Sequence, residues 1–256
     1  MAIGSEVQKA MILAAGEGTR LRPLTQKTPK VLLRVGGKPL IGYTLSWLKS
    51  RGITEVAINL YHLGDKIKEF LSDGFRFGIN ISYSPEDTLL GTAGGVKRIE
   101  HFFNGTFVVV CGDILTDFDL KDMIRFHQKR KAMATLALLE VPNPRDFGIA
   151  EINEERAILT FVEKPPRGSE TDNLASGGVY VLEKGIFDYI PSDGFSDFAY
   201  DIFPKLIEGN LPIYGYVLKA DDYLVDIGTI EKYRKVDEDV KAGRVKIRYE
   251  EQSCIS

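Results

Sequence analysis

The sequence predicts an α/β protein with a mixed, mostly parallel central sheet, helices on both faces, and a β-rich lobe in its second half. Short apolar runs alternate with segments of helical period in the first half, which is typical of a parallel sheet covered on both faces. After Leu120 strand-like runs dominate, and no linker rich in Pro, Gly or Ser separates the halves. We therefore expect a flexible end at 1–8, one domain over 9–243 with parts at 9–120 and 121–243, and a tail at 244–256.

The predicted elements follow in chain order. The first part contains strands at Lys9–Leu13, Glu55–Asn59, Asn80–Tyr83 and Thr106–Cys111, with helices near Leu40–Arg51, Asp65–Leu71 and Gly94–Phe103. The second part begins with a helix near Leu120–Lys131, capped by Asp119. Strands then follow at Ala134–Val141, Gly148–Ile152, Leu159–Glu163, Gly177–Leu182 and Ile213–Val217, with helices at Phe198–Glu208 and Ile230–Ala242. This order indicates a Rossmann-like sheet, in which ligands bind where strands end.

Composition excludes several classes of function. The 256 residues carry a formal charge of -3, so nucleic acid and anionic membranes are not expected as partners. No run approaches the ~18 apolar residues of a spanning helix. Cys111 and Cys254 are the only cysteines, which implies no disulfide framework and fits a reducing, cytoplasmic location. The three histidines lack metal-ligand spacing, and abundant Glu and Lys lean toward a thermophilic source.

The loop after the first strand, AAGEGTRLRPLTQKTPK, combines glycines with basic residues. Gly16 and Gly18 allow a ligand to approach the backbone closely, and consecutive N–H groups there can bind an anion. Arg20 offers a planar fork for phosphate oxygens, and Lys30 after Pro29 adds a point charge. The loop is neither a Walker loop nor the dinucleotide glycine motif, because the residues that close those motifs are missing. Together these features favour a polyphosphate site over a solvated surface loop.

Carboxylates follow two strand-like runs that lie far apart in the chain. Asp113 ends VVVCGD and Asp226 lies in YLVDIGT. Two such groups can hold one Mg²⁺ together with substrate phosphates, although a turn or helix cap is the alternative. Asp117 and Asp119 form a competing Asp-x-Asp pair. We favour helix capping for Asp119, because a helical period begins directly after it.

The segment SPEDTLLGTAGGV, residues 84–96, is the second glycine-rich stretch, and it opens a predicted helix. The alternative to a binding loop is an ordinary helix N-terminus capped by Thr92. Glu86 is an acceptor for N–H groups, which suits guanine with N1–H and N2–H₂ and also suits the N3–H of uracil or thymine.

The segment LAAGEGTRLRPLTQKTPK resembles the signature of the sugar-1-phosphate nucleotidyltransferases, and further motifs follow in the family's order to about Arg234. The resemblance implies that a nucleoside triphosphate and a sugar-1-phosphate react, with Mg²⁺, to give a nucleotide-sugar and pyrophosphate. FVEKPP resembles the family's Glu-Lys-Pro motif, in which Lys164 would hold the sugar phosphate and Glu163 a sugar hydroxyl. RDFGIA and ASGGVYV resemble segments that line the sugar.

The resemblance implies a set of site residues. The expected catalytic residues are Arg20, Lys30 and Lys164. The metal ligands are Asp113 and Asp226. The nucleotide-binding residues are Leu13, Ala14, Ala15, Gly16, Gly18, Thr19, Glu86, Gly91, Thr92 and Ala93. The sugar-binding residues are Gly148, Glu163, Ser176 and Gly178.

The resemblance is greatest to mannose-1-phosphate guanylyltransferases, so GTP and mannose-1-phosphate are the expected substrates. Many of those enzymes have Asn-Ala-Gly where this chain has Ser176-Gly177-Gly178, which leaves the sugar open. A uridylyl- or thymidylyltransferase acting on glucose-1-phosphate, a glycosyltransferase and a non-catalytic nucleotide-sugar-binding regulatory protein are the alternatives. The family's C-terminal left-handed β-helix domain is not expected, and a homodimer is compatible with the sequence.

Overall fold

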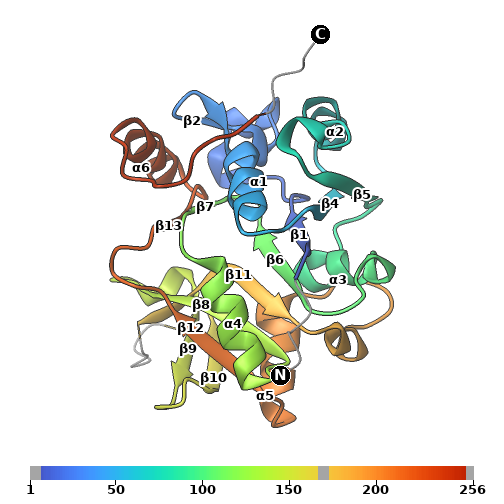
Figure 1. Ribbon diagram of the computed structural model, residues 1–256, viewed down its shortest axis with the longest axis vertical. Helices are drawn as coiled ribbons and strands as arrows, with labels where there is room; N and C mark the ends of the chain where they lie inside the picture. The colour runs from blue at the N-terminus through green and yellow to red at the C-terminus, as the bar shows by residue number, and fades with distance from the viewer. Residues whose placement is uncertain (1–6, 167–172, 252–256) are drawn as a thin grey trace. The chain divides into compact units, whose positions relative to one another are not determined.

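The computed structural model describes residues 7–166 and 173–251 (Figure 1). Residues 1–6 of the expected flexible end and the last five residues, with Cys254, lie outside these ranges. The chain divides into two compact units. Unit 1 contains Leu90–Val109 and Asp119–Ala220, and unit 2 contains Gln8–Leu89, Val110–Phe118 and the chain from Asp221 onward.

Unit 2 is built on parallel strands in the order β1 (Lys9–Leu13), β4 (Glu55–Leu60) and β5 (Asn80–Pro85). Helices α1 (Leu40–Ser50) and α2 (Gly64–Leu71) alternate with these strands along the chain. Leu13 is in register with Asn59, and Asn59 with Ser84, so the three strands end at one edge of the sheet. The predicted parallel part of the fold is therefore confirmed.

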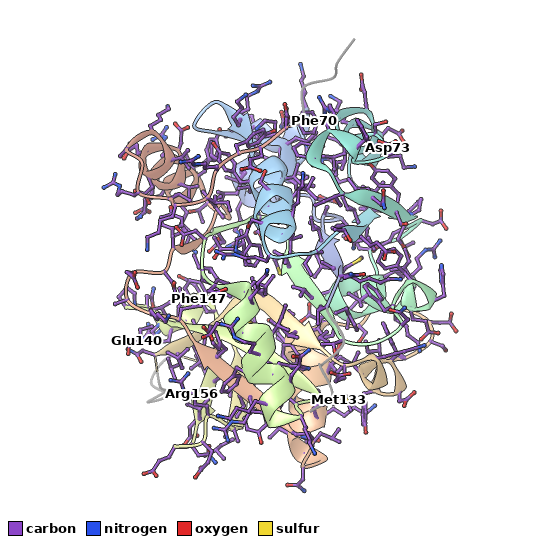
Figure 2. The ribbon with its side chains drawn as sticks, in the orientation of Figure 1. Phe70, Asp73, Met133, Glu140, Phe147 and Arg156 are labelled. Carbon is purple, nitrogen blue, oxygen red and sulfur yellow. The ribbon has the colours of Figure 1, made fainter. Side chains whose placement is uncertain are left out.

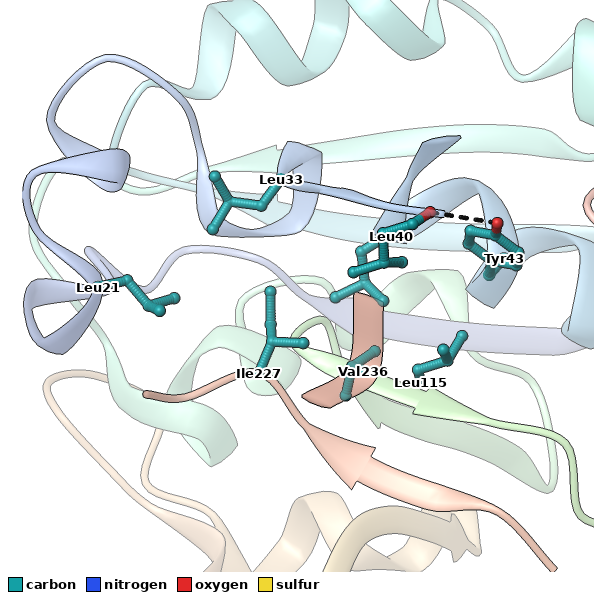
Figure 3. Close-up of a cluster of buried hydrophobic side chains, with 8 residues drawn as sticks. Leu21, Leu33, Leu40, Tyr43, Leu115, Ile227 and Val236 are labelled. Atoms are coloured by element: carbon teal, nitrogen blue, oxygen red, sulfur yellow. Dashed lines mark hydrogen bonds between the residues drawn. The ribbon is translucent and has the colours of Figure 1, made fainter. Parts of the chain in front are cut away.

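The apolar core of unit 2 brings together segments from both ends of the chain (Figure 3). β7 (Ile114–Thr116) pairs antiparallel with β13 (Leu224–Asp226), and α6 (Ile230–Lys241) begins after Thr229, whose side chain accepts from the Lys232 N–H. A short hairpin, β2 (Arg34–Val35) and β3 (Lys38–Pro39), precedes α1. The core consists of Leu21, Leu33, Val35, Leu40, Tyr43, Leu115, Ile227 and Val236, and Val245, Ile247 and Tyr249 of the tail pack against it.

Unit 1 contains the β-rich part that the sequence predicted. Its strands are β8 (Ala134–Glu140), β9 (Gly148–Ile152), β10 (Ile158–Glu163), β11 (Leu174–Leu182) and β12 (Ile213–Val217). The pairs β10–β9, β9–β11 and β11–β8 are antiparallel, whereas β12 runs parallel to β8. The helices of unit 1 are α3 (Gly91–Lys97), α4 (Leu120–Arg130) and α5 (Phe203–Glu208). β6 (Phe107–Cys111) contributes its first three residues to unit 1 and its last two to unit 2.

Two predicted helices differ from the structure. The helix expected over Gly94–Phe103 is the α-helix Gly91–Lys97 followed by a 3₁₀ turn at Glu100–Phe102. The helix expected over Phe198–Glu208 begins as a π-helix at Phe198–Ile202, and its α-helical part has a proline in the first turn. A proline lacks the N–H that an unbroken helix would use there. Within the described ranges, no helix is long and apolar enough to cross a membrane.

Candidate functional site

The loop after β1 contains a turn at Gly18 that a hydrogen bond stabilises, and several residues around this turn are exposed. Gly18 adopts a left-handed conformation with φ of +62°, and a side chain there would lie 2.9 Å from Thr25 Cγ2. The Thr25 hydroxyl donates to the Gly18 carbonyl (2.8 Å). Gly16, Thr19 and Arg20 are exposed. Only glycine suits position 18, and the predicted anion-binding groups of this loop are accessible to a ligand.

The first residues of the predicted nucleotide site are less accessible. Ala14 and Ala15 are each 6% exposed, and Leu13, the last residue of β1, is half-buried. Their apolar side chains offer no polar group to a nucleotide. A role in binding would fall to their main-chain atoms.

Lys30 and Asp113 form an ion pair in unit 2. Lys30 begins the 3₁₀ turn Lys30–Leu32. Asp113 follows β6 and Gly112, where a side chain would approach the Leu13 carbonyl oxygen to 2.7 Å. The side chains of Lys30 and Asp113 are 14% and 25% exposed, so water screens their charges less than at an open surface. Sequence reasoning placed both residues in the site but did not predict that they contact each other.

Asp226 lies on the strand next to Asp113. It pairs with Ile114 in the antiparallel ladder, and the Ile227 N–H donates to the Asp113 carbonyl (2.9 Å). The Asp226 carboxylate accepts from the Gly228 N–H (2.8 Å) and from Lys232.

Arg20 approaches the same segment. A side chain at Gly228 would lie 3.2 Å from Arg20 Nη2. This part of unit 2 therefore brings together the predicted metal ligands Asp113 and Asp226 and the predicted cations Arg20 and Lys30.

The donor set of Asp113 and Asp226 fits magnesium. Mg²⁺ prefers oxygen ligands and uses one or two carboxylates together with substrate phosphates and water. Asp226 ends β13, Asp113 directly precedes the paired strand β7, and the two side chains are each about one quarter exposed. No cluster of three or more His, Cys, Asp and Glu residues that could hold a metal occurs in the described part of the chain.

Glu86 follows β5 and is buried, at 7% exposed. Its N–H donates to the Leu60 carbonyl (2.8 Å), and its carboxylate Oε1 accepts from Asn59 Nδ2 (2.7 Å). Asn59 Oδ1 accepts from the Ala14 N–H (2.7 Å). Sequence reasoning missed Asn59. The available signal was a polar residue near the end of the apolar strand EVAINL.

Gly91 and Ala93 lie in the first turn of α3, in unit 1. Gly91 has φ of +77°, and a side chain there would meet the Ser196 carbonyl oxygen at 2.3 Å. That carbonyl accepts from the Ala93 and Gly94 N–H groups, at 3.0 Å each. Gly91 is therefore required by close packing within unit 1, and the Ala93 and Gly94 amides are already paired.

Thr92 does not cap α3, so the capping alternative is wrong. The N-cap is Leu90, which has no side-chain capping bond. The Thr92 hydroxyl donates to Asp197 Oδ2 (2.9 Å) and accepts from the Phe198 N–H (2.8 Å). Thr92 instead links α3 to the start of the π-helix Phe198–Ile202. This contact joins residues far apart in the chain, so the local sequence could not predict it.

Gly148 and Glu163 lie opposite each other on β9 and β10. A side chain at Gly148 would lie 2.6 Å from Glu163 Oε2 and 2.5 Å from Phe161 Cζ. Burial raises the pKa of Glu163, the Lys164 ammonium offsets part of the rise, and Asp197 adds to it. The carboxylate is therefore held against the glycine in a partly dry environment.

Lys164 projects from the end of β10. Its φ is +50°, an uncommon value for a lysine, and its N–H donates to the carbonyl of Phe147 (3.0 Å), which is labelled in Figure 2. Its side chain is 58% exposed, with Nζ 3.7 Å from Glu163 Oε1. The structure thus places the predicted sugar-phosphate lysine beside the predicted sugar-hydroxyl carboxylate, and both lie in unit 1.

Ser176 and Gly178 form an irregularity in β11. The register with β8 shifts between Ser176 and Tyr180, and Gly178 has φ of +69°. Ser176 Oγ is buried and has no hydrogen-bond partner among the described residues. An unpaired buried hydroxyl is costly, so a polar ligand group could satisfy it. The strand begins at Leu174, earlier than the predicted Gly177. The prediction placed the start too late because Gly177 and Gly178 interrupt the alternation of apolar residues along the strand.

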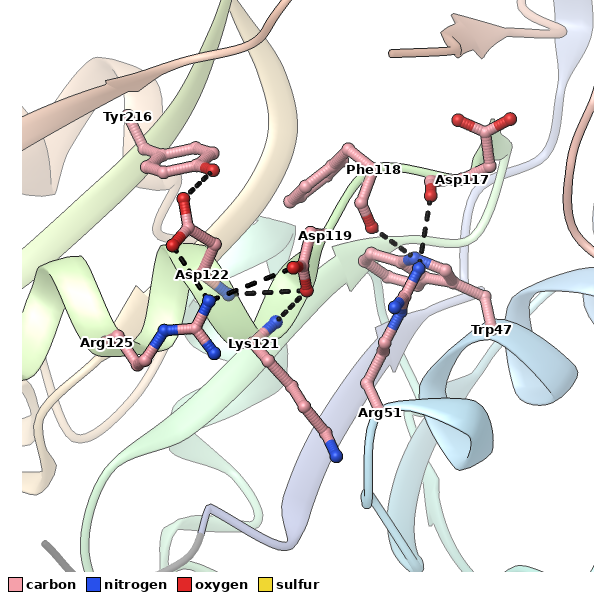
Figure 4. Close-up of polar contacts among 9 residues, drawn as sticks. All are labelled: Trp47, Arg51, Asp117, Phe118, Asp119, Lys121, Asp122, Arg125 and Tyr216. Atoms are coloured by element: carbon pink, nitrogen blue, oxygen red, sulfur yellow. Dashed lines mark hydrogen bonds and ion pairs between the residues drawn. The ribbon is translucent and has the colours of Figure 1, made fainter.

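Asp117 and Asp119 have structural roles in the described chain (Figure 4). The Asp117 carboxylate accepts from the N–H groups of Tyr223 (2.9 Å) and Lys246 (2.8 Å). Asp119 Oδ1 accepts from the amides two and three residues later, at 3.1 and 3.4 Å. The predicted cap of α4 is confirmed, and these bonds argue against the Asp-x-Asp pair as a metal site.

Comparison with known proteins adds an independent finding. Residues 9–243 match the family described as "Nucleotidyl transferase". The chain is 38% identical to a Synechocystis UTP–glucose-1-phosphate uridylyltransferase over 88% of this chain and 61% of that protein. It is 35% identical to a Mycobacterium tuberculosis mannose-1-phosphate guanylyltransferase over 91% and 65%. It is 55% identical to a Neisseria meningitidis N-acetylmuramate α-1-phosphate uridylyltransferase over 75% and 82%. The chain therefore spans less than two thirds of the first two relatives.

Solved structures agree with the fold. A Bacillus anthracis protein crystallised with a sucrose matches 92% of this chain and 96% of its own, with a TM-score of 0.81 and 28% identity. HddC from Yersinia pseudotuberculosis matches 92% of this chain and all of its own, with a TM-score of 0.78 and 26% identity. HddC has also been solved with GMP-PN. The mixed α/β fold with a mostly parallel sheet is shared with these proteins.

Proposed function

Because this chain belongs to the nucleotidyl transferase family, we propose that it transfers a nucleotidyl group from a nucleoside triphosphate to a sugar-1-phosphate. The products are a nucleotide-sugar and pyrophosphate. The observation that carries this proposal is the group of charges in unit 2, where Arg20, Lys30, Asp113 and Asp226 lie around the ends of β1, β6 and β13. Two anions must approach each other in this reaction, so positioned cations are the main requirement.

Each predicted side chain has a task in this scheme. Arg20 and the exposed loop of Gly16 and Thr19 bind the leaving pyrophosphate, with help from Lys30. Lys164 holds the sugar phosphate, whose oxygen attacks the α-phosphorus in line. Mg²⁺ bound by Asp113 and Asp226 would supply further neutralisation of the phosphate charge. The attacking phosphate is already ionised near neutral pH, so no general base is required.

The first substrate pair that we propose is GTP and mannose-1-phosphate. Glu86 offers an acceptor that suits the two N–H groups of guanine, and the GTAGG segment resembles the guanylyltransferase version. The 35% identity to a guanylyltransferase supports this pair. A second candidate is a uridylyltransferase, which is favoured by the 55% identity to an N-acetylmuramate α-1-phosphate uridylyltransferase over 82% of its length.

The test is pyrophosphate release in the presence of Mg²⁺. GTP, UTP, dTTP, CTP and ATP are each combined with mannose-1-phosphate, glucose-1-phosphate and N-acetylmuramate-1-phosphate. Release that requires both a nucleotide and a sugar phosphate is the expected result, and the best pair distinguishes the two candidates. Release of a nucleoside diphosphate from a nucleotide-sugar, or nucleotide-sugar binding without turnover of any pair, would overturn the proposal in favour of a glycosyltransferase or a regulatory protein.

A further inference from the structure

Lys232 occupies an unusual place for a lysine, the first turn of a helix. α6 begins at Ile230, its N-cap is Thr229, and the Thr229 hydroxyl accepts from the Lys232 N–H (3.3 Å). The amide dipoles of a helix make its first turn positive, so acidic side chains are favoured there and a lysine is disfavoured. Departures from such local preferences are expected at functional sites, so the surroundings of this lysine matter.

The lysine forms an ion pair with Asp226, six residues earlier in the chain. Lys232 Nζ lies 2.5 Å from Asp226 Oδ2, and the two side chains are 34% and 26% exposed. The other carboxylate oxygen, Oδ1, accepts from the Gly228 N–H (2.8 Å). Each oxygen of this predicted metal ligand therefore already has a donor, and one of the donors carries a full positive charge.

This ion pair borders the proposed phosphate groups of unit 2. A side chain at Gly228 would lie 2.5 Å from Asp226 Oδ1 and 3.2 Å from Arg20 Nη2, so the carboxylate and the guanidinium flank the same glycine. Lys232 therefore adds a further cation to Arg20 and Lys30. Sequence reasoning assigned no role to it.

We propose that Lys232 is a positioning residue that holds the Asp226 carboxylate as its counter-ion until substrate phosphates draw the ammonium away. A divalent metal ion and the ammonium compete for the same carboxylate, and their like charges repel. In the absence of phosphate the lysine therefore weakens metal binding, and in its presence the lysine is an additional phosphate-binding group. The inference rests on the proposed function, since it assigns a further residue to the same site.

The first measurement is the metal affinity of the full chain without any nucleotide. Mn²⁺ is the probe, because it takes the same oxygen ligands as Mg²⁺ and its unbound form is counted directly by electron paramagnetic resonance. In Lys232→Met, Mn²⁺ should bind about 10-fold more tightly, because a like charge near the ion has been removed. A lysine that only stabilises the local fold predicts the opposite sign, since a loosened Asp226 would bind the ion less well.

The matched control for this measurement is Lys235→Met. Lys235 lies in the same helix, and its Nζ is 2.5 Å from Asp239 Oδ2. The substitution therefore removes the same charge and the same kind of ion pair from α6, but at a carboxylate that has no predicted role in the site. Lys235→Met should keep the wild-type Mn²⁺ affinity.

The second measurement is the binding of inorganic pyrophosphate in the presence of EDTA, so that no metal ion takes part. Lys232→Met should weaken this binding by about 10-fold, because a charge-assisted hydrogen bond is lost, and Lys232→Arg should restore most of the affinity. Asp226→Asn should bind pyrophosphate more tightly than wild type, because the ammonium is no longer held by a carboxylate. That gain should disappear in the double variant with Lys232→Met, which gives a non-additive cycle.

The outcomes separate this inference from the proposed function. Equal or weaker Mn²⁺ binding in folded Lys232→Met overturns the inference, and so does an unchanged affinity for pyrophosphate. If Lys232→Met does not fold, the pyrophosphate affinity of Asp226→Asn decides, and a value no higher than wild type overturns the inference. Absence of pyrophosphate release from every substrate pair overturns the proposed function instead, while the Mn²⁺ affinity of Lys232→Met still tests the ion pair.

Discussion

Gly148→Ala is the sharpest test of how unit 1 builds the sugar side of the proposed site. The added methyl carbon would lie 2.5 Å from Phe161 Cζ and 2.6 Å from Glu163 Oε2. Ordinary contacts of this kind lie near 3.5–4.0 Å, so both groups must retreat by about 1 Å. Phe161 packs edge-on against the fully buried ring of Phe203, with centroids 5.5 Å apart. The ring therefore cannot move away freely.

Overpacking of this kind costs about 1–3 kcal/mol in the free energy of unfolding. We expect Gly148→Ala to lower the urea midpoint accordingly and to raise the KM for the sugar phosphate, because Glu163 is displaced. Nucleotide affinity should stay unchanged. Gly105→Ala is the matched control, since Gly105 lies in the same unit and has no atom within 4 Å of the added carbon. Unchanged stability and sugar-phosphate KM in Gly148→Ala would refute the assigned packing.

Three further predictions concern charge and the C-terminal segment. Because burial raises the pKa of Glu163, its ionised form costs stability above the ordinary glutamate pKa of about 4.3. Glu163→Gln should therefore raise the urea midpoint at neutral pH and lose that gain in acid. A constant difference across pH would contradict this. Lys164→Ala and Asp113→Ala should each lower kcat on the order of 10²-fold, while Lys129→Ala, an exposed lysine of α4, keeps the wild-type rate. Near-wild-type turnover in a folded variant removes that residue from the mechanism. Tyr249→Ala should lower the unfolding free energy by about 1–3 kcal/mol, measured in urea, because its half-buried ring packs edge-on against two other aromatic rings; an unchanged midpoint would show that these ring contacts contribute no stability.

The sequence was sufficient for features that depend on local rules. Apolar runs of strand length located β1, β4 and β6 within two residues. Asp119 was identified as a cap because a helical period follows it, and its side chain does accept from the first amides of α4. Gly18 was expected to allow a positive φ because it lies in the glycine-containing loop after the first strand, and its φ is +62°. Each of these features is decided by residues that are adjacent in the chain.

Features decided by distant residues could not be predicted in the same way. Thr92 lies near the start of a helix, and threonine is a common residue at the N-cap position, yet the partners of Thr92 are Asp197 and Phe198, more than 100 residues away. Asn59 binds Ala14 and Glu86 across two strand pairs. Local sequence does not specify which strands are neighbours or how they are aligned. Once the register of the parallel strands is known, the contacts of Asn59 follow directly.

Ion pairs with lysines keep two carboxylates of unit 2 in place. Lys30 is paired with Asp113, and Lys232 with Asp226. Each lysine balances a carboxylate that would be costly to bury alone. A phosphate that binds Lys30 must compete with Asp113, and a metal ion that binds Asp113 must compete with Lys30. In the proposed reaction the two ligands would therefore assist each other, because each would occupy the partner that the other releases.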